Sequence, residues 1–298
     1  MNNKKEELRA RKDFGVTNTK KREYPPLPEK LNQTTIDAHC HLDIEDNDIW
    51  ISVEDALAKA ASVGITGIVQ VGVDVASSKW AVKTAKEFKQ INAAVAIHPN
   101  EAPVIALEKG ESALDEAIAE IALLAQEEVV RAIGETGVDF FRTGDEGREF
   151  QEKSFRKHIQ IANSVNKPVM VHDRDAHEDA LRILDDEKAN MVIFHCFSGD
   201  AEFAQEIVKR NWVLSFAGTC TFKNAQNLRD ALKVTPLTNV LVETDSPFLT
   251  PMPFRGSPNA SYMIPLTLEV MAKEMNVDLE TITNATRENA IRLFGKFE

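Results

Sequence analysis

The chain has 298 residues, of which 43% are hydrophobic and 7% aromatic, and its formal net charge is −12. That length is enough for one large core such as a (β/α)8 barrel of roughly 250 residues, and no apolar run reaches the roughly 20 residues that cross a bilayer. The acidic balance argues against a surface that binds nucleic acid by charge alone, although bound divalent cations would invert the field inside a cleft.

The cysteines and the chain start bear on the compartment. Cys40, Cys196 and Cys220 are too few and too scattered for a disulfide framework, which favours a reducing cytoplasm. The N-terminus carries charges where a secretory signal needs an apolar stretch. Because no G-x-G-x-x-G or Walker-type loop occurs, we expect no nucleotide cofactor. The sequence thus predicts a cytoplasmic protein without membrane contact, and it does not determine the oligomeric state.

The N-terminal segment, residues 1–33, differs from the rest of the chain. Lys and Arg outnumber Asp and Glu there, whereas the whole chain is acidic. Pro25, Pro26 and Pro28 lie too close together for a helix and indicate an extended linker. We predict a flexible basic tail over residues 1–33. The alternative is a basic arm that helps to recruit an anionic substrate.

From about residue 34 to residue 298, strand-like and helix-like patterns alternate. Short apolar runs typical of buried strands lie at 34–38, 67–71, 92–97, 129–134, 168–171, 191–194, 212–216 and 240–244. Helical patterns lie at 53–63, 76–89, 112–127, 147–165, 176–187, 201–210, 225–233, 262–275, 278–284 and 286–294. This alternation predicts a parallel α/β fold.

The ends of five strands decide between a barrel and an open sheet. The first, fourth, fifth, sixth and eighth runs each end in His, Glu or Asp. Only a closed ring brings all these ends to one axial site, because an open doubly wound sheet has its site at a single switch point. We therefore predict a single (β/α)8 TIM barrel over residues 34–298, with extra C-terminal helices.

The first strand supplies two imidazoles. His39 and His41 are two positions apart, so both side chains point the same way while Cys40 points elsewhere. Glu135 ends the fourth strand between glycines that permit a close backbone approach, and its two oxygens allow it to bridge two metals. A surface or helix-capping role is the alternative for Glu135.

The remaining predicted ligands end later strands. His172 and His195 end the fifth and sixth strands, and neutral imidazole suits zinc, manganese or similar ions. Asp245 ends the eighth strand, where it is expected to bind a metal and to accept the proton of the attacking water. Glu243 also faces inward but lies deeper, so Asp245 is preferred. Asp245 and Glu135 are the predicted catalytic residues.

Three further groups are predicted to contact an anionic substrate. Arg174, two residues after His172, is placed to hold a phosphate, with a salt bridge to a neighbouring Asp as the alternative. Ser198 is expected to open a helix whose backbone N–H groups bind an anion, with an ordinary cap as the alternative. Arg255 is a possible second anion contact or a surface residue. His98 ends the third strand and is expected to contact substrate or to support the ligands.

Two cations about 4 Å apart would lower the pKa of a shared water and clamp the attacking and leaving oxygens. That chemistry suits the hydrolysis of phosphoesters, and also of amides and lactones. The ligands alone do not choose among these substrates. His158 and His177 lie on helical patterns and are not expected in the site.

Five blocks resemble the signature of the TatD family of metal-dependent deoxyribonucleases. They are Asp37-Ala-His-Cys-His-Leu-Asp43, Gly134-Glu-Thr-Gly-Val-Asp-Phe-Phe-Arg142, Val171-His-Asp-Arg-Asp-Ala176, His195-Cys-Phe-Ser-Gly199 and Glu243-Thr-Asp-Ser-Pro247. The likeness runs from about residue 34 to residue 296 and includes Phe222-Lys-Asn-Ala225. It implies a TIM barrel, a divalent-metal site with the six ligands named above, a bridging Glu135, and hydrolysis of DNA phosphodiester bonds.

The chain departs from this family in two places. The family often has His-Pro-His-Glu where this chain has His98-Pro-Asn100-Glu101, and it often has a Glu after the Asn of the last loop, where this chain reads Asn259-Ala-Ser. Both places are expected to line the substrate groove.

The sequence as a whole predicts a cytoplasmic deoxyribonuclease with two divalent ions, Zn, Mn or Mg, acting on single-stranded DNA or DNA ends. The first rival is a metal-dependent hydrolase of small-molecule C–N or C–O bonds, of the cyclic amide, lactone or deaminase type. The second is a barrel that keeps the ligands but serves as a scaffold.

Overall fold

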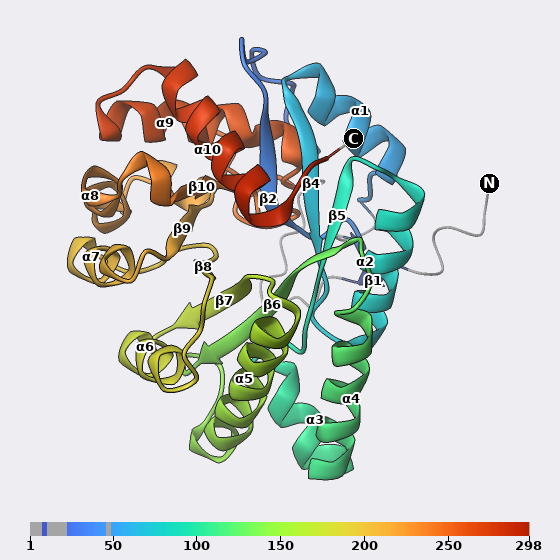
Figure 1. Cartoon of the computed structure of the whole chain (residues 1–298). Coiled ribbons are helices and arrows are strands. Elements are labelled where there is room, and N and C mark those ends of the chain that lie inside the picture. The colour runs from blue at the N-terminus through green and yellow to red at the C-terminus, as the bar shows by residue number, and fades with distance from the viewer. Residues whose placement is uncertain (1–7, 11–22, 46–48, 298) are drawn as a thin grey trace.

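The computed structural model describes residues 8–10, 23–45 and 49–297. Eight parallel strands follow one another in chain order around a barrel (Figure 1). They are β2 (Thr35–Cys40), β4 (Ile65–Val71), β5 (Ile91–Val95), β6 (Val130–Asp139), β7 (Val169–Arg174), β8 (Val192–Phe194), β9 (Val213–Phe216) and β10 (Val240–Val242). An isolated parallel bridge between Cys40 and Ser246 joins the last strand region to the first. The predicted TIM barrel is confirmed.

The helices form the outer layer around these strands (Figure 1). They are α1 (Val53–Ser62), α2 (Val75–Glu87), α3 (Glu101–Lys109), α4 (Glu111–Leu124), α5 (Asp145–Val165), α6 (His177–Asp186), α7 (Ala201–Lys209), α8 (Gln226–Val234), α9 (Ile264–Met275) and α10 (Leu279–Phe294). Short 3₁₀ turns lie at Gly218–Thr221, Leu237–Asn239 and Ser261–Met263. The extra C-terminal helices expected from the sequence are therefore present.

Two apolar layers explain why alternating sequences fold this way. Inward-facing side chains such as Val69, Met170 and Leu241 fill the barrel, and Phe294 at the end of α10 packs into the same cluster. Outward-facing strand residues pack with the buried faces of the helices in a second, larger cluster. Filling both faces of every strand requires continuous apolar runs, which is why these strands are recognisable in the sequence.

Two helical details differ from the predictions. Helix α3 was not predicted, since no helical pattern was assigned between residues 97 and 112. Pro103 is tolerated because it lies in the first turn, where a backbone N–H has no partner to lose. At the C-terminus, the two predicted helices at 278–284 and 286–294 form one continuous helix, α10.

The predicted basic tail falls largely outside the described residues, and its flexibility stays a prediction. Of its described part, β1 (Arg9–Ala10) pairs in parallel with β3 (Ile44–Glu45). The Arg9 side chain donates to the buried carboxylate of Asp43, and the Arg9 backbone N–H donates to the Asp43 carbonyl at 2.7 Å. This contact carries a segment of the tail next to the block that contains His41.

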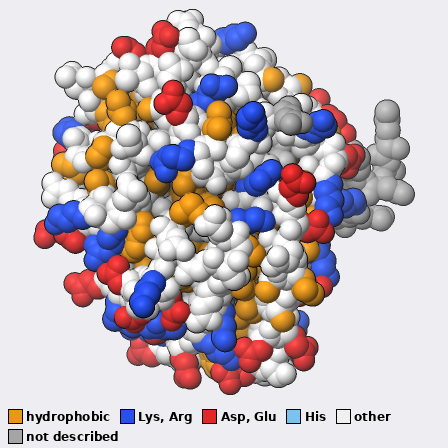
Figure 2. All heavy atoms as spheres, viewed as in Figure 1, with side chains coloured by type: hydrophobic (Ala, Val, Ile, Leu, Met, Phe, Trp, Pro, Cys, Tyr) orange, Lys and Arg blue, Asp and Glu red, His pale blue; other side chains and the backbone are white. Residues whose placement is uncertain are grey.

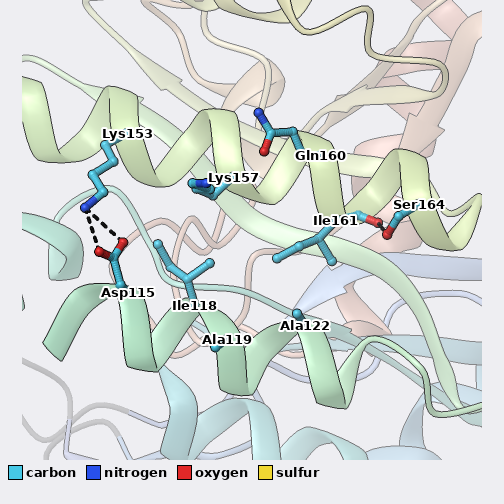
Figure 3. Close-up of a pocket in the computed structure, with 9 residues that line it drawn as sticks. All are labelled: Asp115, Ile118, Ala119, Ala122, Lys153, Lys157, Gln160, Ile161 and Ser164. Atoms are coloured by element: carbon cyan, nitrogen blue, oxygen red, sulfur yellow. Dashed lines mark hydrogen bonds and ion pairs between the residues drawn. The ribbon is translucent and has the colours of Figure 1, made fainter. Parts of the chain in front are cut away.

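The outer surface carries both signs of charge. Figure 2 shows one face on which Lys and Arg side chains are interspersed with Asp and Glu. An open groove of about 550 Å³ lies between α4 and α5 (Figure 3), where Lys153 pairs with Asp115 at 2.9 Å. None of its lining residues belongs to a predicted site. Among the described residues, no helix combines the length and the apolar character needed to cross a membrane.

His158, which was not expected in the site, has a structural role on α5. Its Nε2 accepts the backbone N–H of Ile97 at 3.0 Å, and its Nδ1 donates to the carbonyl of Ser154 at 2.7 Å. Burial lowers the pKa of His158 from 6.5 to about 4. The neutral ring therefore supports the end of the β5 segment that leads to His98.

This burial predicts a pH-dependent contribution to stability. Because the folded pKa of His158 lies below its unfolded value, the contribution is complete above pH 6.5 and is lost as the pH falls towards 4. It amounts to about 3 kcal/mol at most. We expect the free energy of unfolding of wild type minus that of His158→Gln, measured in urea, to shrink between pH 6.5 and pH 4.5. A difference that does not change with pH would contradict this role.

Candidate metal centre

The end of β2 turns two histidines toward the barrel axis. The pairing of β2 with β4 shifts register between Asp37 and Cys40. Ala38 belongs to the inner apolar cluster and Cys40 to the outer one, so strict alternation breaks within this strand end. A bulge of this kind re-aims side chains. His39 and His41 consequently lie together, with their Nε2 atoms 3.2 Å apart, and Cys40 points away as predicted.

Glycines on both sides of Glu135 bring β6 close to β7. A Cβ atom on Gly134 would lie 2.4 Å from the Cβ of Met170, and one on Gly137 would lie 2.0 Å from the carbonyl oxygen of His172. Gly137 also has a φ of +142°, which side chains rarely adopt. The two glycines therefore permit the approach that places the carboxylate of Glu135 among the histidines of neighbouring strands.

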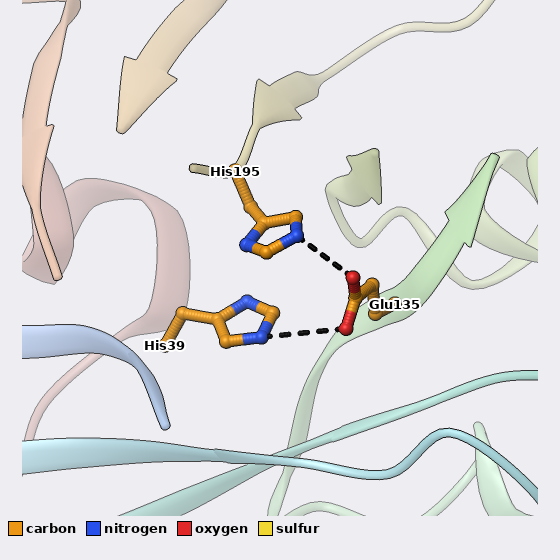
Figure 4. Close-up of side chains that lie close together, drawn as sticks. All are labelled: His39, Glu135 and His195. Carbon is orange, nitrogen blue, oxygen red and sulfur yellow. Dashed lines mark ion pairs between the residues drawn. The ribbon is translucent and has the colours of Figure 1, made fainter. Parts of the chain in front are cut away.

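The Glu135 carboxylate is the common partner of the cluster. Its Oε1 lies 2.7 Å from His172 Nδ1, 2.8 Å from His195 Nε2 and 3.3 Å from His98 Nε2. Its Oε2 lies 3.5 Å from His39 Nε2. Figure 4 shows the rings of His39 and His195 both directed at this carboxylate, each reaching a different oxygen. The Glu135 side chain therefore contacts histidine nitrogens that come from different strands of the barrel.

Asp245 closes the other side of the cluster. Its Oδ1 lies 3.4 Å from His41 Nε2 and 3.7 Å from His39 Nε2. The residue has a φ of +53°, a left-handed conformation that Asp and Asn tolerate better than most residues. Its backbone N–H donates to the carbonyl of His39 at 2.9 Å. Asp245 is thus fixed beside the β2 histidines where the barrel closes.

Within the described residues, three overlapping groups place their ligand atoms within 4.8 Å of one another. They are His39, Glu135 and His195; His39, His41 and Asp245; and His98, Glu135 and His172. All six predicted ligands are among them, together with His98. Buried imidazoles and carboxylates are the donor set that binds zinc and similar divalent ions.

The charges of the cluster also fit a cation. Burial acts to raise the pKa of Glu135, but the histidines around it, foremost His195, hold that pKa well below its usual range. Burial acts to lower the pKa of His195, yet Glu135 and Glu243 raise it well above the usual value. The Oε2 atom of Glu243 is buried and has no hydrogen-bond partner among the described residues. Buried carboxylates and imidazoles with a spare carboxylate oxygen suit divalent cations.

Outer residues orient the histidine rings. Glu243 Oε1 lies 3.2 Å from His195 Nδ1 and accepts the backbone N–H of Cys196 at 2.8 Å. His41 Nδ1 lies 3.0 Å from the carbonyl oxygen of Val71. Asp139 Oδ2 lies 3.2 Å from His172 Nε2, although Glu135 already occupies the other nitrogen of that ring. Contacts of this kind fix the tautomer and the basicity of metal-binding imidazoles.

The sequence reasoning missed part of this outer layer. Glu243 was set aside as too deep, and Asp139 was noticed only as a member of a block. Asp37 is fully buried and accepts hydrogen bonds from Thr244 and from the backbone of His39, and burial raises its pKa to about 7. The available signal was the position of Asp37 and Asp139 inside the same blocks as the ligands.

The predicted substrate contacts have different neighbours in the structure. Arg174 has no carboxylate partner among the described residues, so the alternative of a salt bridge to Asp173 or Asp175 is wrong; Asp173 pairs with His177 instead. The exposed Arg255 lies over the ring of Phe222, at 4.3 Å. His98 Nε2 lies 3.3 Å from Glu135 Oε1, so His98 is part of the cluster and does not lie only at its edge.

The prediction that a helix opens at Ser198 is wrong. Helix α7 begins at Ala201, and the Asp200 carboxylate caps it by accepting the backbone N–H of Phe203 at 3.0 Å. The Asp200 carboxylate already interacts with the positive end of the helix dipole, which removes the argument for a bound anion at this N-terminus. Ser198 itself is exposed, and its hydroxyl donates to the carbonyl of Asp173 at 3.1 Å.

The contact of Glu243 with His195 predicts a loss of metal affinity on substitution. Glu243→Gln keeps the shape but removes the charge that holds the ring, so we expect affinity for Zn²⁺ or Mn²⁺ to fall roughly 10- to 100-fold. Titration calorimetry of metal-stripped protein measures this directly. Glu206→Gln, on the surface of α7, is the matched control. Equal affinities of the two variants would show that Glu243 does not support the site.

Comparison with known proteins adds an independent finding. Residues 36–295 match the model of the family described as TatD related DNase. The chain is 38% identical over 265 residues to "Uncharacterized metal-dependent hydrolase TatD" of Mycobacterium tuberculosis, covering 87% of this chain and 97% of that protein. It is 39% identical over 260 residues to "Uncharacterized metal-dependent hydrolase YabD" of Bacillus subtilis, covering 87% and 98%.

A solved structure shows the same architecture. The crystal structure of YJJV, a TatD homologue from Escherichia coli, superposes with a TM-score of 0.77 at 25% sequence identity, covering 88% of this chain and 98% of that chain. The region matched by the family model, residues 36–295, contains every residue of the histidine and carboxylate cluster.

Proposed function

The chain belongs to the TatD related DNase family and is a metal-dependent hydrolase of that family; from this premise we propose that it is a deoxyribonuclease that cleaves DNA phosphodiester bonds. The observation that carries the proposal is the shared carboxylate of Glu135, which joins histidines from opposite sides of the barrel mouth. A carboxylate in that position suits two divalent cations rather than one.

The six predicted ligands would divide between two metal positions that share Glu135. His39 and His41, with Asp245 beside them, lie near Glu135 Oε2, and His172 and His195 lie near its Oε1. Divalent cations held there would lower the pKa of a water molecule and neutralise charge on a phosphodiester. Zinc, manganese and magnesium all remain candidates for these positions.

The protein's own groups then have distinct tasks. The carboxylate of Asp245 is partly accessible at the mouth, with 16% of its side chain exposed, and it accepts the proton of the water that attacks phosphorus. As the P–O bond breaks, negative charge grows on the phosphate oxygens and on the leaving oxygen. Fixed positive groups at the mouth stabilise that charge without having to reorganise.

His98 is suited to donate rather than to bind metal. Its Nδ1 accepts the backbone N–H of Asn100 at 3.0 Å. In a neutral ring the proton is then on Nε2, which lies 3.3 Å from Glu135 Oε1. That N–H holds the Glu135 carboxylate, or turns to an oxygen of the substrate. We therefore assign His98 to positioning and substrate contact, and not to the ligands.

Arginines supply the remaining anion contacts. Arg174, with no carboxylate partner among the described residues, is two residues beyond His172 on β7 and is placed to bind a phosphate oxygen. Arg255 lies on the loop that follows β10 and is proposed as a further contact with the chain of the substrate. DNA is therefore attracted by a few local groups, since the net charge is −12.

One observation favours a second candidate function. An acidic, mixed-charge surface (Figure 2) suits a small substrate better than a long polyanion. The alternative is a metal-dependent hydrolase of small-molecule C–N or C–O bonds, such as cyclic amides or lactones. The cationic Arg174 at the mouth weighs against this alternative. Its guanidinium has no carboxylate partner among the described residues and suits an anionic substrate, whereas an amide or a lactone is neutral.

Metal-stripped protein and labelled single-stranded DNA test the proposal. Oligonucleotides labelled at the 3′ or the 5′ end are incubated with Mg²⁺, Mn²⁺ or Zn²⁺ added singly, with His39→Ala as the control. We expect cleavage that needs added metal and is lost in the variant, and the product ladder gives its direction. Absence of cleavage with every metal would overturn the DNase proposal and leave the small-molecule hydrolase to be tested with a substrate panel.

A further inference from the structure

An exposed aromatic ring lies beside the metal centre without an assigned task. Phe141, in the turn after β6, is 62% exposed. The guanidinium of Arg174 lies over its ring, 3.8 Å from the ring centre. Single exposed apolar side chains are common on protein surfaces, so the guanidinium beside this ring is what distinguishes it from the exposed Leu107 and Leu123. The pair therefore presents a flat apolar face next to a cation that has no carboxylate partner among the described residues.

The turn that carries Phe141 is fixed to the centre. The backbone N–H of Phe141 donates to Asp139 Oδ1 at 3.1 Å, and the other oxygen of Asp139 lies 3.2 Å from His172 Nε2. The backbone N–H of Phe140 donates to the carbonyl of Arg174 at 3.0 Å. Asp139 thus holds a proposed metal ligand and the aromatic turn at once, so the ring has a set position relative to the cluster.

Strand geometry gives the scale of that position. Arg174 and His172 are two residues apart on β7, so their side chains leave the same face roughly 6.6 Å apart along the strand. That separation is close to two stacked bases at about 3.4 Å each. A base within about two nucleotides of a phosphate bound at the cluster therefore reaches the Arg174–Phe141 pair.

Another arginine–phenylalanine pair nearby lacks these properties. Arg148 lies over Phe140 at 4.3 Å, but Arg148 is paired with Asp145 at 3.3 Å, and Phe140 is half-buried. Its charge is partly neutralised and its ring already packs against the core. Phe141 instead has an exposed ring, and the guanidinium of Arg174 beside it has no carboxylate partner among the described residues.

We propose that Phe141, backed by Arg174, is a stacking platform for one unpaired base of the nucleic acid substrate, within about two nucleotides of the phosphate that is cleaved. The proposal rests on the nuclease function proposed above and specifies its substrate as single-stranded. In a duplex both faces of each base are covered by its neighbours, whereas an unpaired base offers its face to an aromatic ring. Stacking of this kind tolerates any base sequence, because every base has such a face.

Substituting Phe141 tests the platform through activity. We expect Phe141→Ala to lower kcat/KM for single-stranded DNA roughly 5- to 150-fold, the range that loss of one base–aromatic stack gives. The ratio of kcat/KM for normal DNA to that for an abasic oligonucleotide of equal length and charge falls by the same factor. Phe141→Trp restores that ratio, whereas Phe141→Leu, which keeps apolar bulk without an aromatic face, does not.

A binding measurement tests the same point without turnover. In metal-stripped Phe141→Trp, we expect single-stranded DNA to quench the fluorescence of the new tryptophan, measured as the difference from wild type, whose three tryptophans form the background. The abasic oligonucleotide leaves that signal unchanged. Leu123→Ala, which alters an equally exposed apolar residue on α4, is the control and keeps wild-type activity.

The outcomes separate the two proposals. If wild type cleaves no DNA with any metal, the nuclease function fails first. If wild type cleaves DNA but Phe141→Ala keeps its preference for bases over abasic sites, and the Phe141→Trp signal does not respond, the stacking platform is overturned while the nuclease stands. Equal losses of activity on normal and abasic DNA would overturn it too, since they would show a structural effect of the substitution.

Discussion

Glu135→Gln is expected to lose bound metal and turnover together, with the fold retained. Glutamine has nearly the same shape, but one of its two oxygens is replaced by an NH₂ group that cannot bind a cation. The imidazoles of His172, His195 and His39 then lose their shared negative partner. We expect the loss of kcat/KM to exceed the roughly 10- to 100-fold effect of removing an outer partner, and metal analysis by mass spectrometry to show substoichiometric metal.

The control for this experiment is Glu243→Gln, which makes the same chemical change one layer further out. Glu135→Asp is a second comparison, because it keeps the charge and shortens the reach. Circular dichroism and thermal melting establish that each variant is folded. Full metal content in Glu135→Gln, or a loss no larger than that of Glu243→Gln, would contradict the central place given to this carboxylate.

Asp245→Asn is expected to keep the metal better than Glu135→Gln and still lose most turnover. Asn tolerates the left-handed backbone at this position, where φ is +53°, so the barrel closure is preserved. His39 and His41 remain as ligands on that side of the centre. The amide cannot accept the proton of the attacking water, which predicts a fall in kcat of roughly 10²- to 10⁴-fold.

Turnover measured together with metal content distinguishes this role from a purely ligating one. Single-turnover measurement with saturating metal separates the chemical step from metal loss. Turnover close to that of wild type at saturating metal would exclude Asp245 as the proton acceptor.

The strand ends could be predicted from the sequence because a barrel requires its strands to be apolar. A barrel strand is apolar on both faces, so a single His, Glu or Asp at its end stands out. His39, Glu135 and Asp245 were found in this way, and the structure brings them together, although β6 continues past Glu135 to Asp139. The H-x-H spacing also predicted that Cys40 points away from the cluster, and it does.

The supporting contacts were not readable, because they join residues that lie far apart in the chain. Glu243 is 48 residues from His195, yet its carboxylate reaches that ring. Asp139 links β6 to the ring of His172 on β7 and to the turn that carries Phe141. No local pattern marks such a pair, since either carboxylate would look the same if it pointed into solvent.

Local patterns also gave wrong answers where the backbone departs from regular geometry. Helix α3 was missed, although Pro103 in its first turn is compatible with a helix. Ser198 was taken for a helix start, whereas Asp200 is the cap. Which of several polar residues caps a helix depends on where the preceding strand ends. For α7 that position is set by the packing of β8 against its neighbours.

The sequence by itself determined the alternation of strands and helices, the closed barrel and the identity of the residues at the strand ends. Those features depend on periodicity and on side-chain type, which are local properties of the chain. Only the tertiary structure decided which histidines meet at the Glu135 carboxylate, that His98 lies close enough to touch it, and that Phe141 lies open beside Arg174. These are distances between strands, set by the register shifts and the glycine contacts that bring β6 and β7 together.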